Sequence, residues 1–139
     1  MNYKIIGKYI KDLNFSIPNP KIFFLLSKNI SNYKINIDIK SNQIKQNIIE
    51  VLTSLTLSSS TNDFEKINTK IVFATIVELS NENIDKKEIE SIVLIKVPSQ
   101  IYGELRKIFI NLFENSGFKD IKISENVDFK KLYDMRKTQ

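Results

Sequence analysis

The chain has 139 residues, of which 42% are hydrophobic and 27% are charged, which is ordinary for a soluble globular protein. This length predicts a single domain over residues 1–139 with a core of its own. Because the sequence contains no His and no Cys, the common nucleophilic triads, His bases and zinc sites are excluded, and we expect no enzymatic activity and no cofactor. No apolar run could span a bilayer, and the N-terminus lacks the apolar core of a signal peptide, so we expect a cytoplasmic protein without membrane insertion.

The formal net charge of +5 raises nucleic acid as a partner. The lysines are spread along the chain and are best interpreted as solvated surface, so nucleic-acid binding is not favoured. A weak pattern of basic and aromatic residues does occur near the N-terminus, at Tyr3, Lys4, Lys8, Tyr9 and Lys11. An edge strand protected by lysines explains it equally well, and a basic oligomeric nucleic-acid-binding module stays an alternative.

The N-terminal part predicts one short strand, composed of two apolar-polar segments, followed by an apolar loop. Tyr3–Ile10 and Leu13–Ile17 are apolar-polar segments that Lys11–Asp12 separates. The two prolines of Pro18–Pro20 remove backbone donors, so a central strand must stop there. Ile22–Leu26 is an apolar cluster that we expect to form a loop against the body of the protein.

Three long strands are predicted in the middle of the chain. Ile35, Ile37 and Ile39 alternate with polar residues, which is the two-residue period of a half-buried strand. Ile48–Ser58 alternates in the same way, a polar loop is expected over Ser58–Asp63, and Lys70–Leu79 is rich in β-branched residues. The short connections favour antiparallel neighbours.

The segment before Pro98 is ambiguous between helix and strand. Asp85 and Glu88 have the spacing of a capping box, which favours a helix start. In Ile89–Val97 the β-branched residues favour a strand, whereas the position and the spacing of Ile89, Ile92 and Val93 favour a helix. We expect a helix that breaks at Val97–Pro98, because the residue before a proline disfavours the helical region.

The stretch from Pro98 to Gly117 predicts the longest helix. Its apolar residues recur with a period of 3.6 and form one stripe, at Ile101, Tyr102, Leu105, Ile108, Phe109, Leu112 and Phe113. Pro98 suits the first turn and Gly117 suits the left-handed position after the last turn. Gly103 costs about 1 kcal/mol relative to Ala in a helix interior. Two interpretations stay open: an exposed site, where Gly103→Ala would raise stability, or a close backbone approach across a subunit interface, where it would weaken assembly.

A short helix over Asp128–Met135 closes the chain, with Phe129, Leu132 and Tyr133 on one side. The expected class is therefore α+β, with a four-stranded antiparallel sheet backed by a long C-terminal helix plus short helices. The apolar residues exceed what one helix stripe over one sheet requires. Such a surplus indicates burial in an oligomer or a groove for extended apolar peptides.

The order of these segments resembles the SecB protein-export chaperones. Tyr9–Phe15 followed by Pro18–Pro20 is similar to the family's K-D-[IL]-x-F strand and P-N-x-P turn. Val97–Pro98, an amphipathic helix with Arg106, and Val127–Tyr133 are similar to its C-terminal half, which ends in I-D-F-x-x-L-[YF]. The resemblance covers nearly the whole chain, and its two terminal motifs are the specific ones.

The resemblance implies a non-enzymatic holdase that binds unfolded precursor polypeptides in apolar grooves for export. It implies a homo-oligomer, a dimer of dimers, and delivery to the SecA motor. Two sets of residues match the family's groove by position: Ile35, Ile37 and Ile39 on a strand, and Phe129, Leu132 and Tyr133 on the C-terminal helix. Asp12 matches an acidic position through which the family's sheet meets a basic SecA tail.

The chain departs from the family pattern at several positions. It has Val97 where the family usually carries Cys, and Ile101–Arg106 where the family has F-P-[FY]-A-R. Ser16 and Val72 stand where the family has acidic residues, and the net charge is positive instead of negative. These departures leave open a SecB-like chaperone that serves a toxin-antitoxin or phage system.

Overall fold

The computed structural model describes residues 2–29, 33–59, 68–81, 83–118, 121 and 123–137. These residues form one antiparallel sheet in the order β1-β4-β3-β2, from β1 (Tyr3–Ser16), β2 (Tyr33–Lys45), β3 (Ile48–Ser59) and β4 (Asn68–Leu79). The helical elements are α1 (Pro20–Asn29), α2 (Lys86–Ser91), the π-helical turn η2 (Ile92–Lys96), α3 (Val97–Asn115) and α4 (Phe129–Lys137). The expected four-stranded antiparallel sheet with a long C-terminal helix is confirmed. Of the loop expected over Ser58–Asp63, residues 60–63 lie outside the described part.

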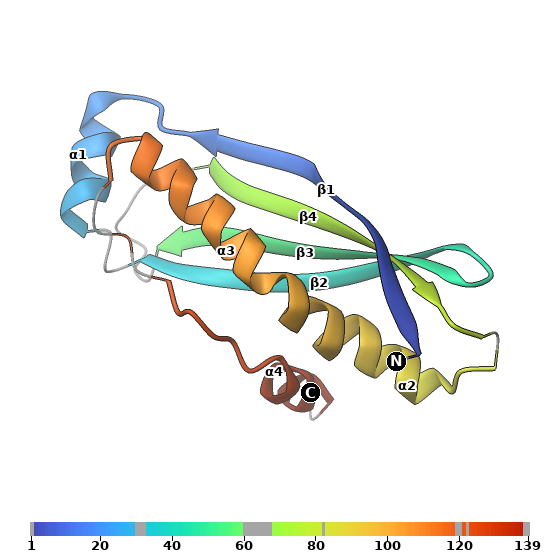
Figure 1. Cartoon of the computed structure of the whole chain (residues 1–139). Coiled ribbons are helices and arrows are strands. Elements are labelled where there is room, and N and C mark those ends of the chain that lie inside the picture. The colour runs from blue at the N-terminus through green and yellow to red at the C-terminus, as the bar shows by residue number, and fades with distance from the viewer. Residues whose placement is uncertain are drawn as a thin grey trace.

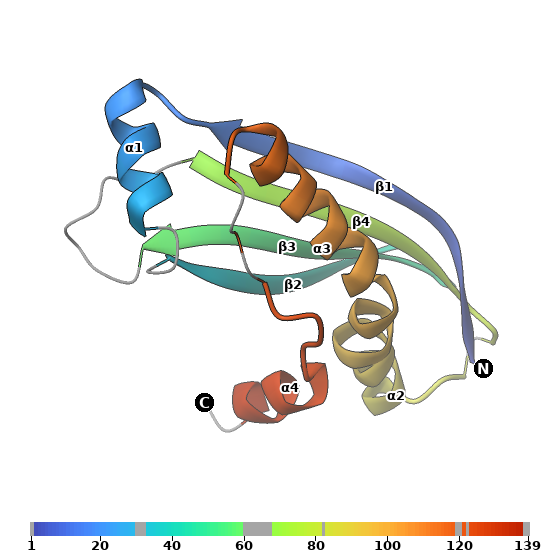
Figure 2. The same ribbon diagram turned by 60° about the vertical axis from the view of Figure 1, so that its left-hand side comes forward.

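The helices are placed on one face and at the ends of the sheet. The continuous run α2-η2-α3 crosses one face, while α1 lies at one end of the sheet beside the end of α3 (Figure 1). α4 lies next to the β2 edge and the α2-η2 segment (Figure 2). The other face of the sheet carries none of the described helices. No helix in the described part is long and apolar enough to cross a membrane.

The core lies between the sheet and α3. Cross-strand pairing puts alternate residues of neighbouring strands on the same face, as Ile37 pairs with Leu55 and Leu55 with Ile71. The buried residues of α3 follow the predicted stripe: Val97, Pro98, Ile101, Tyr102, Leu105, Phe109 and Phe113. One apolar cluster therefore joins the strands to the helix.

The N-terminal strand is longer than the sequence suggested. β1 pairs with β4 from Tyr3 to Ser16 and shifts register at two places, one of them between Ile10 and Asp12. The extra residue, Lys11, is therefore absorbed in a β-bulge and does not end the strand. The two segments therefore form one long strand, and the prediction that the N-terminal strand is short is wrong.

The apolar cluster Ile22–Leu26 belongs to α1 and not to a loop. The Asn19 side chain accepts a hydrogen bond from the Ile22 amide at 2.9 Å, and Pro20 occupies the first helical position. An N-cap Asn followed by Pro is a helix start signal. Ile22 and Leu26, one turn apart, are buried, so the helix has an apolar face that the core anchors.

Pro98 does not break the helix. Ile89–Val97 is helical as expected, but Lys96 and Val97 keep right-handed helical angles and the helix continues to Asn115. A proline ring clashes with the carbonyl four residues earlier in a regular α-helix. Here the wider turn η2 precedes it, with the Val97 amide bonded to the Ile92 carbonyl, so the expected break at Val97–Pro98 is wrong.

We expect Gly103→Ala to raise the free energy of unfolding by about 1 kcal/mol, because alanine has the higher helix propensity. Gly103 is exposed on α3, and an added Cβ would have no atom within 4 Å. Urea denaturation at a fixed protein concentration measures the change.

Gly117→Ala is the matched control for this prediction and should lower stability. Gly117 follows α3 with φ of +97°, where an added Cβ would lie 3.1 Å from the Phe23 ring. A loss of stability in Gly103→Ala as well would contradict an open site at position 103 and would indicate that another chain covers it.

Candidate functional site

The C-terminal helix α4 begins at a well-defined cap. The Asp128 carboxylate accepts a hydrogen bond from the Lys131 amide at 3.0 Å, and its carbonyl accepts one from the Leu132 amide. Asp is a favoured N-cap residue because it satisfies an amide that has no partner in the first turn. The sequence Val127-Asp128-Phe129 thus fixes where α4 starts.

Two side chains of α4 hold it against the long helix. The Phe129 ring is buried and meets the Tyr102 ring edge to face, with 5.9 Å between the ring centroids. The Tyr133 hydroxyl donates a hydrogen bond of 2.8 Å to the Glu90 carboxylate. One apolar and one polar contact therefore orient the helix.

The segment that leads into α4 is fastened to α3 by two further hydrogen bonds. The Tyr102 hydroxyl donates to the Ser124 carbonyl at 2.7 Å, and Arg106 Nε donates to the Ile123 carbonyl at 3.1 Å. Burial raises the pKa of Tyr102, so its hydroxyl stays a neutral donor. The bond to the Ile123 carbonyl explains why an arginine lies beside the buried side of α3.

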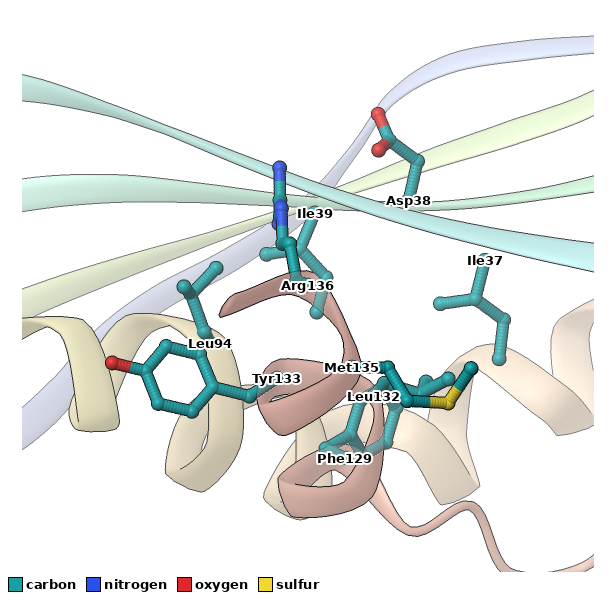
Figure 3. Close-up of a pocket in the computed structure, with 9 residues that line it drawn as sticks. All are labelled: Ile37, Asp38, Ile39, Leu94, Phe129, Leu132, Tyr133, Met135 and Arg136. Atoms are coloured by element: carbon teal, nitrogen blue, oxygen red, sulfur yellow. The ribbon is translucent and has the colours of Figure 1, made fainter. Parts of the chain in front are cut away.

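A cavity of about 280 Å³ opens between the edge strand β2, the helical turn η2 and α4 (Figure 3). Its lining is mostly apolar, and Figure 3 shows Ile37 and Ile39 pointing from β2 toward the α4 side chains. The lining residues are Ile37, Asp38, Ile39, Leu94, Phe129, Leu132, Tyr133, Met135 and Arg136.

Five of the six residues predicted for the groove line this cavity: Ile37, Ile39, Phe129, Leu132 and Tyr133. Ile35 shares their face of β2 but is not part of the lining, and it packs against the core. The sequence analysis missed Asp38, Leu94, Met135 and Arg136. For Arg136 the signal was its position three residues after Tyr133 and four after Leu132, which places it on the same side of α4.

The cavity combines a buried floor with an exposed rim. Ile39 and Phe129 are buried, whereas the side chains of Leu132 and Met135 are 42% and 53% exposed. Because β2 is an edge of the sheet, none of the other described strands pairs with its outer side. The arrangement suits an extended apolar polypeptide, which can bury side chains against the rim and floor.

The uncovered face of the sheet carries mixed charge. Asp12 is exposed there, and its carboxylate accepts a hydrogen bond from the side-chain amide of Asn14 at 3.2 Å. Glu50, on the same face, is held by the Tyr9 hydroxyl and by Lys11 at 3.2 Å. The hydrogen bond from Tyr9 is the main cause that lowers the pKa of Glu50, although burial opposes it.

A hollow of about 260 Å³ surrounds Asp12 on this face. Its lining includes three cations, so an acidic surface like the one that the resemblance implied is not formed. The lining residues are Lys11, Asp12, Asp38, Lys40, Leu52, Ser54, Lys70 and Val72.

Comparisons with known proteins agree on one family. Residues 1–139 match the family described as preprotein translocase subunit SecB. A protein of Pelagibacter ubique, named as a protein-export protein SecB, is 42% identical over 97% of this chain and 96% of its own length. The protein-export protein SecB of Ehrlichia chaffeensis is 26% identical over 98% of this chain and 90% of its own.

A solved structure shares the fold. It is a SecB-like chaperone of Mycobacterium tuberculosis in complex with a ChAD peptide from an antitoxin. It superposes with a TM-score of 0.67 at 12% identity and covers 91% of this chain and 88% of that one. With the match over the full sequence and the 42% identity to a relative of the same length, the chain belongs to the SecB family.

Proposed function

We propose that this protein is a holdase chaperone of protein export that binds unfolded precursor polypeptides in the cavity between β2 and α4. The observation that carries the proposal is an apolar cavity at the open edge of the sheet, with Leu132 and Met135 exposed on its rim. Burial of apolar side chains is non-directional, so one such surface can hold many unrelated chains. A holdase of this kind has no catalytic step and works in the cytoplasm before translocation.

The export role is supported by the names of the relatives, which are protein-export proteins. The antitoxin role of the solved neighbour rests on 12% identity and is not favoured for this chain. A nucleic-acid-binding role is not favoured either, because Lys8 and Lys11 of the N-terminal pattern are paired with Glu104 and Glu50.

The protein is expected to act as a homo-oligomer, a dimer of dimers. Ile10 and Leu13 lie on the edge strand β1 and are 45% and 40% exposed, next to backbone groups that no other strand pairs. Pairing two copies at this edge would cover both the apolar side chains and the backbone. Light scattering of the wild type tests this assembly, and a stable monomer would contradict it.

SecA is the proposed receiver of the clients, with Asp12 as a contact on the uncovered face of the sheet. The exposure of Asp12 supports this contact, whereas the neutralisation of Glu50 by Tyr9 and Lys11 reduces the negative charge available to a basic partner. A pull-down of SecA with wild type and with Asp12→Asn tests it.

We expect Leu132→Asp to weaken client binding by about tenfold, because it removes apolar area from the rim and adds a charge. Leu132 is partly exposed, so the variant should still fold. Suppression of aggregation of a slowly folding client, titrated with the chaperone, measures the effect.

Ile44→Asp is the matched control, since Ile44 is an apolar residue of β2 that is 51% exposed and does not line the cavity. It should keep the wild-type activity. If the wild type does not suppress aggregation, the proposed function is wrong. If both variants lose activity equally, the binding surface is not this cavity.

A further inference from the structure

Arg136 stands at the mouth of the cavity. Figure 3 shows its side chain reaching from α4 toward the edge of β2, above the apolar residues of the lining. The Arg136 side chain is exposed and forms no hydrogen bond or ion pair with any residue that the structure describes. A guanidinium without a partner at the rim of an apolar site can pair with a charge that a ligand brings.

The nearby carboxylates do not neutralise Arg136. Asp38 is in the same lining, but Figure 3 shows its carboxylate on the far side of β2, pointing away from α4. That direction follows from strand alternation, because Ile37 and Ile39 point toward α4. The Glu90 carboxylate accepts a hydrogen bond from the Tyr133 hydroxyl, and the Asp128 carboxylate caps the first turn of α4.

The other cations among the described side chains of α4 lie outside the cavity lining. Lys130 and Lys131 are exposed in its first turns, and Asp134 is the acidic residue within the described side chains of the helix. Lys130 and Lys131 line a separate hollow together with Asp128 and Asp134, so Arg136 is the cation of the cavity lining. Like charges on a bound segment would be repelled there.

We propose that Arg136 selects clients whose apolar segment is flanked by a carboxylate, over clients with the same segment flanked by lysine. This inference rests on the proposed function, because the segment must first bind in the cavity. A guanidinium binds a carboxylate through two parallel hydrogen bonds, which gives the contact geometric specificity in addition to charge. Since Arg136 is exposed, we expect a preference of about fivefold, the upper range for exposed ion pairs.

The experiment compares two fluorescent peptides that share one apolar core and differ in their flanking residues, Asp in one and Lys in the other. Fluorescence anisotropy with the full chain gives both affinities at low and at physiological ionic strength. The Asp-flanked peptide should bind about fivefold more tightly to the wild type at low salt, and the difference should shrink at higher salt. Arg136→Gln should remove the difference, and Arg136→Glu should reverse it.

Lys107→Gln is the matched control for net charge. Lys107 is exposed on α3, outside the cavity lining, so this variant should keep the preference. A wild type that binds both peptides equally overturns the inference but leaves the proposed function intact. Binding of neither peptide contradicts the proposed function itself, and an equal loss of preference in Lys107→Gln and Arg136→Gln assigns the effect to overall charge and also overturns the inference.

Discussion

Phe113→Ala is expected to lower the free energy of unfolding by about 3–5 kcal/mol, the range for a large aromatic residue truncated in a packed core. Phe113 is fully buried, and its ring contacts three other phenylalanine rings. The centroid distances are 5.0 Å to Phe15, 5.1 Å to Phe109 and 5.8 Å to Phe118. The residue therefore joins β1, α3 and the segment after α3, and the cavity left by its removal cannot close by a small local shift.

Urea denaturation followed by circular dichroism at one protein concentration measures this loss. Phe24→Ala is the control, because Phe24 is 67% exposed on α1 and should change stability by less than about 0.5 kcal/mol. If Phe113→Ala cost no more than Phe24→Ala, the cluster around the end of α3 would not be the core of this fold.

The strands of the sheet were predictable from the sequence because each has one face in the core. The alternation of Ile35, Ile37 and Ile39 indicates a half-buried strand, and β2 has that strand at that place. The alternation does not say where a groove ends along the strand. For that reason all three isoleucines were predicted in the groove, whereas only Ile37 and Ile39 line the cavity beside α4, and a groove contact of Ile35 stays a prediction.

Predictions from local sequence preferences were wrong where tertiary packing determined the secondary structure. Pro98 disfavours a helix at the preceding residue, yet Val93, Val97 and Ile101 are buried on both sides of it. Keeping these residues on the sheet requires one continuous helix, and the wider turn η2 makes room for the proline ring. Tertiary pairing also outweighs the local signal at Lys11, because a bulge lets β1 stay paired with β4 past an extra residue.

Only part of the candidate site was predicted, because the sequence pattern was read for apolar residues alone. Phe129, Leu132 and Tyr133 form the apolar side of α4, which the helical period gives directly. Arg136 lies on the same side by its spacing, but a charged residue at the end of a helix is ordinarily solvated and carries no signal by itself. Its placement at the cavity mouth required the position of α4 beside β2.

Phe129→Ala is expected to release α4 from the body of the protein while the sheet and α3 stay folded. Phe129 is only 2% exposed, and a further side-chain anchor of α4 is the hydrogen bond from Tyr133 to Glu90. Truncation removes about 3–5 kcal/mol of burial and packing, which is more than a hydrogen bond such as that of Tyr133 contributes. Because α4 lies at the edge of the fold, undocking it locally costs less than unfolding the core.

Hydrogen exchange separates these two outcomes. The α4 amides should lose protection in Phe129→Ala, whereas amides of β3 and β4 such as Val51 and Ile71 should keep theirs. Client affinity should fall by at least about tenfold, since Leu132 and Tyr133 leave the cavity with the helix. In Leu132→Asp, by contrast, affinity should fall while α4 stays protected. Equal loss of protection in the sheet and in α4 would mean that α4 belongs to the same cooperative unit as the core, and that the cavity cannot open without unfolding the protein.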